Sequence, residues 1–224
     1  MDQAAKLHPG IGKICAIYDK TVAVQPVTIE EERKCDMKKY ELTDETLEIG
    51  MTTLHRIKAL VAFADVEIGD TGGWVEKKSN LNQDGNAWVY GNARVYGNAR
   101  VYGNACVYGN ARVYGDAGVY GNAWVYGNAR VCGNAYVYGN AHYMTISPIG
   151  SRNDTITFAR DKQGRIFANV GCFYGSLSEF RAKVRNTHGD NNHAKAYLLA
   201  AQLAELRLDT TPIEDKQEDG CNED

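Results

Sequence analysis

Between Gly85 and Met144 the chain repeats a six-residue pattern of small, apolar and polar positions ten times without an insertion. A unit runs Gly, Asn, Ala, a variable residue, Val and usually Tyr. Because residues two apart on a strand point to the same side, Ala and Val share one face, and the variable residue and Tyr share the other. The Gly-Asn pair suits a corner, since both residues tolerate the left-handed backbone region. The pattern predicts short strands joined by tight corners.

Two arrangements use such corners. In an antiparallel meander, Val89 would lie opposite Arg94, and each face of the sheet would mix apolar and charged side chains. In a coil that bends the same way at every corner, each Ala and Val stays inside. Three six-residue sides then close a coil of 18 residues, and stacked coils pair strands in parallel. Only the coil satisfies the apolar pattern, so we predict a mainly β protein built on a three-sided parallel β-helix.

The units resemble the hexapeptide repeats of the hexapeptide acyltransferase superfamily. That family places an aliphatic residue at i, often Asn at i+3 and a small residue at i+4, and Val89, Asn92 and Ala93 stand in those positions. The resemblance implies a left-handed coil and assembly as a trimer. It also implies an acetyl-CoA or acyl-carrier groove and a catalytic His in those members that are enzymes.

Three further segments are similar to those of phage and prophage hexapeptide proteins of unknown function. They are residues 39–46, which read KYELTDET, residues 72–76, which read GGWVE, and residues 171–175, which read GCFYG. This resemblance implies a phage origin.

The segments before the repeat predict an N-terminal β cap over residues 37–65, with strands at 39–42 and 53–63. The solenoid is expected over residues 66–144. Its first part, 66–84, reads as a degenerate coil in which Val75, Leu81 and Ala87 are in phase. Such atypical end units cover the open ends of repeat arrays.

After Met144 the period changes, and residues 145–208 predict a ββαα C-terminal cap. Alternating residues at 155–160 and 165–172 indicate a hairpin. Ser176 and Glu179 form a capping-box signature for a helix that ends at Gly189. A second helix is expected over 192–208. Its apolar side is expected to contain three leucines, Leu199, Leu203 and Leu206.

The two ends of the chain differ from the rest. Residues 209–224 hold seven acidic residues and one Lys, a net charge of −6. They read as a disordered acidic tail. Residues 1–36 have two interpretations. They are either an extension upstream of a native start at Met37, because the purine-rich codons of Glu30–Lys34 suit a translated ribosome-binding site, or a genuine N-terminal arm.

Composition narrows the function only slightly. The net charge of −3 favours no particular partner. The six cysteines show no CxxC spacing, which favours a reducing bacterial cytoplasm over a disulfide framework or a zinc site. No apolar run approaches the ~20 residues of a membrane helix. We therefore expect no metal, no cofactor and no membrane partner.

The 18-residue period stacks outward side chains into columns. Arg94, Arg112 and Arg130 form a basic column, and Tyr96 and Tyr114 lie beside it. A second column holds Trp88, Cys106, Trp124 and His142. These aromatic ladders either stabilise the coil by stacking, with Arg lying over the Tyr rings, or form an interface. We predict an interface made by the three arginines together with Tyr96, Tyr114, Trp88 and Trp124.

The predicted function is a non-enzymatic binding or scaffold protein. It presents this surface to a protein, such as a second and third copy or a host factor, and less readily to a nucleic acid or another anion. The alternative is an acyltransferase that uses His142, the one histidine of the repeat. No extruded loop and no acidic residue at a suitable spacing support that alternative. His188 and His193 read as a helix stop and a helix start rather than metal ligands.

Overall fold

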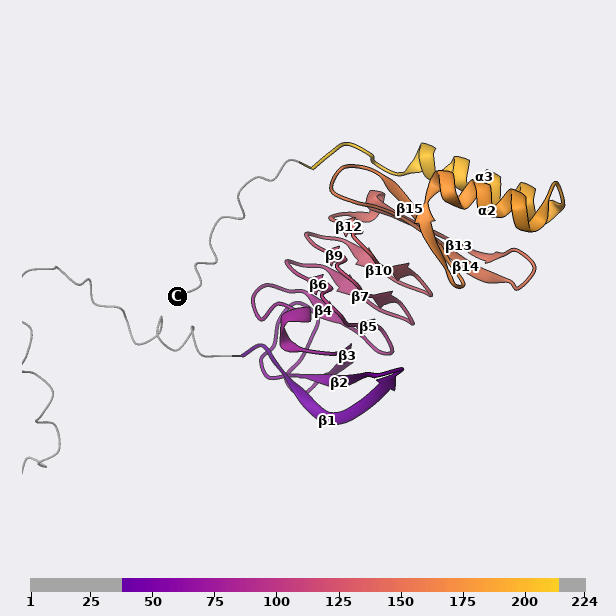
Figure 1. The fold of residues 1–224 in the computed structure, drawn as a ribbon. Coiled ribbons are helices and arrows are strands. Elements are labelled where there is room, and N and C mark those ends of the chain that lie inside the picture. The colour runs from indigo at the N-terminus through magenta and orange to yellow at the C-terminus, as the bar shows by residue number, and fades with distance from the viewer. Residues whose placement is uncertain (1–37, 214–224) are drawn as a thin grey trace, which may run out of the picture. The chain divides into compact units, whose positions relative to one another are not determined.

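The computed structural model describes residues 38–213, so the expectations for residues 1–36 and for most of the acidic tail lie outside the described part. The described chain is mainly β, with a solenoid of short strands and two helices near its C-terminal end (Figure 1). Nine two-residue strands make three coils of the solenoid. They are β4 Trp88–Val89, β5 Arg94–Val95, β6 Arg100–Val101, β7 Cys106–Val107, β8 Arg112–Val113, β9 Gly118–Val119, β10 Trp124–Val125, β11 Arg130–Val131 and β12 Tyr136–Val137.

The strands pair in parallel with an 18-residue register, as Arg94 with Arg112 and Val95 with Val113. The three faces of the solenoid are β4-β7-β10, β5-β8-β11 and β6-β9-β12. Every Ala and Val of the nine strand units is buried, with at most 2% exposure. The parallel coil is therefore confirmed and the meander is excluded. The left-handed turn belongs to the family resemblance alone.

Glycine makes the corners. Gly97, for example, has φ of 70°, and a Cβ there would lie 3.2 Å from the backbone nitrogen of Gly115 in the next coil. A side chain would thus meet both a strained backbone and its neighbour. The tenth unit breaks the pattern because Gly139 is extended and a short 3₁₀ helix follows, η2 Asn140–His142.

Before the regular coils lie β1 Tyr40–Ile49, β2 Thr52–Ala59, β3 Thr71–Val75 and the 3₁₀ turn η1 Lys78–Asn80. The strands β1, β2 and β3 pair antiparallel, and β3 then pairs in parallel with β5. Val75 lies opposite Val95 and Leu81 opposite Val101, so this first coil spans 20 residues rather than 18. The expectation that Ala87 is in phase with Val75 and Leu81 is wrong, since two extra residues separate them.

The C-terminal part has four strands, where the sequence predicted two. They are β13 Tyr143–Ile149, β14 Asp154–Arg160, β15 Ile166–Val170 and β16 Phe173–Ser176, in that order across one antiparallel sheet. β13 directly continues the last coil, and β16 is too short and glycine-interrupted to stand out by alternation. Tyr143 and Ala159 pack into the solenoid core, so this sheet continues that core.

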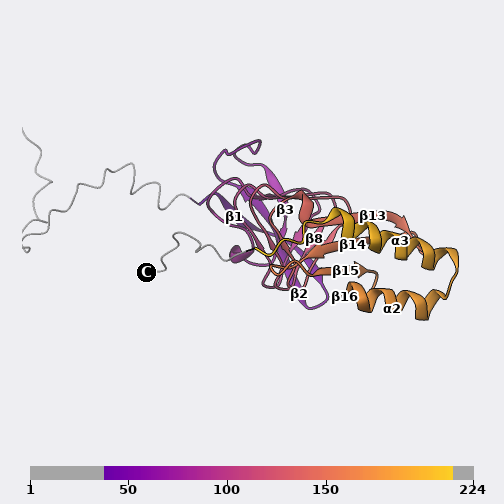
Figure 2. The same cartoon turned by 90° about the horizontal axis from the view of Figure 1, so that it is seen from above.

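Two helices, α2 Leu177–His188 and α3 Asn192–Arg207, lie side by side on one face of this sheet (Figure 2). The capping box at Ser176 and Glu179 is present, and Asn191 caps α3 through the backbone N–H of Ala194. A second core forms between the sheet and the helices around Phe158 and Phe180. No helix within residues 38–213 is both long enough and apolar enough to span a bilayer.

Candidate functional site

The basic column forms as the 18-residue period predicts. Arg94, Arg112 and Arg130 occupy equivalent positions on adjacent parallel strands, and all three are half-buried. Trp74 of β3 precedes them in register, with the guanidinium of Arg56 stacked over its ring at 4.4 Å. Strands ~4.8 Å apart hold these cations close enough to repel one another by about 1 kcal/mol per pair even in water.

Nothing in the described chain neutralises this column. No carboxylate within residues 38–213 forms an ion pair with Arg94, Arg112 or Arg130. Arg130 donates a hydrogen bond of 3.0 Å to the carbonyl of Gly171. In contrast, the buried Nε of Arg94 has no hydrogen-bond partner. Within residues 38–213, Arg94 and Arg112 are therefore the two arginines of the column whose guanidinium groups have neither a hydrogen-bond acceptor nor an ion-pair partner. We call the face that contains them, β5-β8-β11 with its tyrosines, the basic face.

Tyr96 and Tyr114 stack beside the arginines with ring centroids 5.2 Å apart and planes at 4°. Burial raises the pKa of both phenols, that of Tyr114 to about 12, so both are neutral at physiological pH. The amide of Asn169 donates to the Tyr114 hydroxyl and to the Cys132 sulfur, which ties the ladder to the C-terminal sheet. The rings stack on each other, and none of the three column arginines lies over a ring in the described chain.

The second predicted column is only partly exposed. Trp88 has 1% exposure because Tyr40 and Phe63 pack edge-on against it at 6.0 and 5.3 Å. Its assignment to a binding surface is wrong. Trp124 is 52% exposed. His142 does not continue this column. The backbone N–H of Trp124 donates to the side chain of Asn140 instead of to the backbone of a further regular coil.

A groove of about 680 Å³ runs along this second face, where Cys106 is the small residue between Trp88 and Trp124. One wall is a ladder of amides, with Asn86, Asn104 and Asn122 joined by hydrogen bonds of 3.1 Å. The rest of the groove is lined by Ala64, Asp65, Tyr90, Tyr108 and Trp124. The sequence signal for this groove was a small residue in a column that otherwise carries Trp.

The thiol of Cys106 is poorly suited to nucleophilic chemistry. Burial, followed by the charge of Asp65, raises its pKa above the usual value. A reactive cysteine instead needs an electropositive setting that favours the thiolate. The groove therefore holds no activated thiolate at Cys106.

His142 is held by the end of the solenoid. Its Nδ1 accepts a hydrogen bond of 3.0 Å from the backbone N–H of Tyr138. Its Nε2 lies 3.8 Å from a carboxylate oxygen of Asp209, so an acidic neighbour exists that the sequence spacing did not reveal. Burial, and then the charge of Arg160, lowers the pKa of the ring, which is neutral at pH 7 with its proton on Nε2. The basic nitrogen is already occupied, so the ring lacks the free acceptor that a general base needs.

His188 and His193 occupy the positions expected of a helix stop and a helix start. Their ring centroids are 6.0 Å apart, and His188 packs on Tyr197. Within residues 38–213 no group of three potential metal ligands converges.

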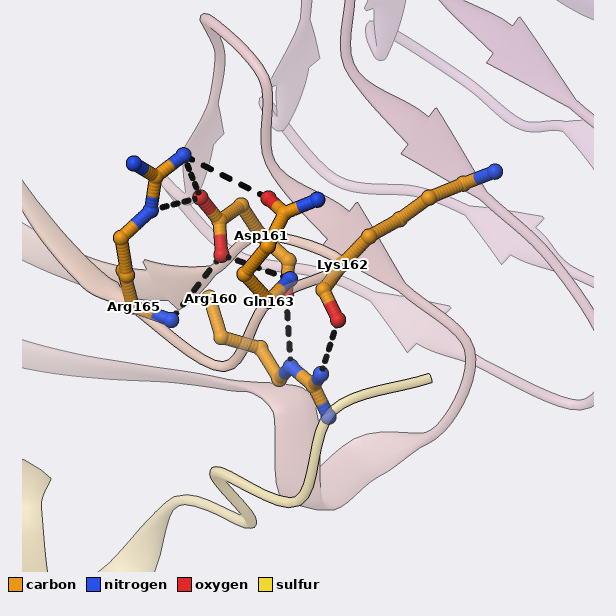
Figure 3. A network of polar contacts seen from close by, with 5 residues as sticks. All are labelled: Arg160, Asp161, Lys162, Gln163 and Arg165. Atoms are coloured by element: carbon orange, nitrogen blue, oxygen red, sulfur yellow. Dashed lines mark hydrogen bonds and ion pairs between the residues drawn. The ribbon is translucent and has the colours of Figure 1, made fainter. Parts of the chain in front are cut away.

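The most buried charges lie in the β14–β15 hairpin (Figure 3). Arg160 donates to the carbonyls of Asp161 and Lys162, and to that of Asp209 in the segment after α3. The carboxylate of Asp161 accepts from the backbone N–H groups of Gln163 and Arg165 and pairs with the Arg165 guanidinium. Every oxygen of Asp161 is thus engaged, which indicates that this network fastens the C-terminal segment to the hairpin.

The stacked parallel coils and their inward Ala and Val define a β-solenoid repeat protein. The family model of the YdcK beta solenoid repeat matches residues 87–103, 93–109, 99–115 and 105–121, within the regular coils. No curated protein matches the chain.

Proposed function

We propose that this chain is a non-enzymatic binding or scaffold protein whose solenoid presents the basic face to an acidic protein partner. The observation that carries the proposal is the uncompensated column, since no carboxylate within residues 38–213 pairs with Arg94 or Arg112. Cations on adjacent strands of one face repel one another, and a partner carboxylate bound to the guanidinium groups would offset that repulsion. Arg beside stacked Tyr is also a typical composition for protein interfaces.

The proposed partner is a host protein in a bacterial cytoplasm. A phage origin of this chain and its membership of the hexapeptide family are proposed from the sequence resemblance alone. The same resemblance implies assembly as a trimer through the coils, and the mass of the assembly in solution decides whether the chain forms this trimer or a dimer.

The geometry of His142 favours this proposal over acyl transfer. An acyltransferase needs a histidine whose acceptor nitrogen faces its substrate, whereas the Nδ1 of His142 faces the backbone of Tyr138. Calorimetric titration with acetyl-CoA tests the point. Saturable binding that is lost in His142→Gln would favour the enzyme instead.

The direct experiment is affinity capture from infected or lysogenic bacteria with three tagged proteins, namely wild type, Arg94→Glu/Arg112→Glu and Arg100→Glu. Arg130 is left unchanged because its bond to Gly171 supports the fold. Arg100 is an exposed arginine at the equivalent position of the β6-β9-β12 face and is the matched control. A partner retained by wild type and Arg100→Glu but lost by the double variant supports the proposal. A partner retained by all three proteins would exclude the basic face.

A further inference from the structure

Helix α3 carries apolar residues on two opposite faces. Its inner face packs on the sheet and α2 through Ala194, Tyr197, Ala200, Ala201 and Ala204. The leucines predicted for that inner face lie on the outside instead, with Leu199 64%, Leu203 48% and Leu206 86% exposed. A helix that is apolar all round is normally covered on both sides. The outer leucines are therefore an unpartnered apolar stripe.

The spacing of the outer residues is informative. Ala196, Leu199, Leu203 and Leu206 follow each other at intervals of three, four and three residues. This is the a/d spacing that packs one helix against another as knobs into holes. We call these four residues the α3 seam, and their spacing specifies a helix as the occupant rather than a strand or a flat surface.

The chain's own segments do not match the seam. Helix α2 lies along the flank of α3, where Arg181 pairs with Glu205 at 2.6 Å. Residues 214–224 contain no large apolar side chain. Leu7, Ile11, Ile14 and Tyr18 do follow a four-three-four spacing, but Pro9, Gly10 and Gly12 lie among them and disfavour a helix. Neither sequence therefore favours the helix that the seam requires as its partner.

We propose that the α3 seam binds the α3 seam of a second copy of this chain, in an antiparallel pair about a two-fold axis. In that arrangement Ala196 lies opposite Leu206 of the partner copy, and Leu199 lies opposite its Leu203, so the most exposed leucine meets the smallest residue. Such self-complementary pairing is what a two-fold interface requires. The pairing is independent of the basic face, and it would present two such faces from one assembly.

The interface is small. The exposed fractions of the three leucines sum to about two fully exposed leucine side chains per copy. A patch of this size lies at the low end of specific interfaces, so we expect a dissociation constant in roughly the micromolar range. Assembly is therefore expected to depend on concentration.

The test is sedimentation equilibrium of the full chain between roughly 1 and 300 µM, a range that brackets a micromolar dissociation constant. The triple variant Leu199→Gln/Leu203→Gln/Leu206→Gln is compared with wild type and with Met51→Gln/Ile68→Gln, which changes two exposed apolar residues outside the helices. Wild type and the control are expected to reach twice the monomer mass, and the triple variant to dissociate at least tenfold more readily. Circular dichroism at the lowest concentration checks folding, and if the triple variant unfolds, Leu206→Gln alone is compared in the same way.

Three results would overturn the proposal. They are a wild type that stays monomeric throughout, a wild-type trimer, and a dimer that the leucine substitutions leave intact. A trimer would instead indicate assembly through the coils. Neither Arg94 nor Arg112 belongs to the α3 seam, so the two proposals fail separately. A chain that dimerises but captures no partner would contradict the proposal for the basic face alone, and a chain that captures its partner as a monomer would contradict the proposal for the seam alone.

Discussion

The ammonium of Lys39 donates a hydrogen bond of 2.9 Å to the carbonyl oxygen of Ala87, which lies 48 residues later in the chain. The same ammonium lies 3.3 Å from the carbonyl of Gly85 and above the ring of Phe63. These carbonyls belong to the segment where two extra residues interrupt the six-residue period before the first regular coil. Lys39 thus satisfies the backbone where the solenoid cannot pair it.

This burial predicts an unusual pH dependence. Desolvation lowers the pKa of Lys39 from 10.5 to about 8, against the smaller opposing effect of Asp84. Below pH 8 both the folded and the unfolded chain carry the proton, so the cost of the buried charge is fully present. Between pH 8 and 9.5 the folded chain loses it while the unfolded chain keeps it, so the free energy of unfolding should rise, by about 1 kcal/mol.

Chemical denaturation at pH 7.5 and 9.5 measures this change, with Lys39→Met as the comparison. The variant should be less stable overall, since it leaves the carbonyls unpaired, but should show little rise across this interval. An equal rise in both proteins would contradict the assignment to Lys39.

A charge inside the solenoid should be severe. Val107 has 0% exposure and is surrounded by Ala and Val of its own and adjacent coils. Val107→Asp would bury an unpaired carboxylate and should lower the free energy of unfolding by more than about 4 kcal/mol. Arg100→Asp, one residue before a core valine but exposed, should cost less than about 1 kcal/mol. Thermal melts by circular dichroism compare the two, and a wild-type melting temperature for Val107→Asp is the outcome that the fold cannot accommodate.

His142 should contribute stability that is lost on acidification. Its pKa is lowered by burial, so as the pH falls below about 6.5 the unfolded chain binds the proton before the folded chain does. Protonation of Nδ1 would also break its bond from Tyr138. The melting temperature should fall between pH 6.5 and 5, and His142→Gln should fall less steeply. Identical slopes in the two proteins would show that His142 is not responsible.

Asp161 should be needed for the attachment of the segment after α3. Its 1%-exposed carboxylate takes four hydrogen bonds and ion-pair contacts from Gln163 and Arg165, and Arg160 beside it binds the Asp209 carbonyl. Asp161→Asn replaces one charged acceptor oxygen by an amide NH2, which cannot accept from the Arg165 guanidinium, and should cost about 1–3 kcal/mol. Hydrogen exchange should then rise at the backbone N–H of Asp209 and Ile213, which bond to Ala141 and Lys162. Unchanged hydrogen exchange at these two N–H groups would show that the Asp161 network does not hold the segment after α3 in place.

The solenoid was predictable because its information is local. The Ala and Val of each six-residue unit determine which residues face inward. The register of Arg94 with Arg112 and the burial of Val107 therefore follow from the period alone. The helix ends near Gly189 and Asn191 were also predictable, since capping depends on neighbouring residues.

The errors occur where distant segments meet. Trp88 shares its column with Trp124 but is covered by Phe63, which no periodic argument places there. The acidic neighbour of His142 comes from beyond α3, 67 residues later. On α3 both faces are apolar, and the small alanines, rather than Leu199, fit the close approach of helix and sheet.

The central claim, that the basic face contacts a partner, is tested most directly by site-specific photo-crosslinking in the host cell. A benzophenone amino acid replaces Tyr114, beside Arg112, in one protein, and Tyr126, 52% exposed on the face with the groove, in another. The account predicts a crosslinked band at position 114 that disappears when Arg94 and Arg112 are also changed to Glu, and no such band at 126. A band at 126 that persists in the double arginine variant, with none at 114, would contradict it.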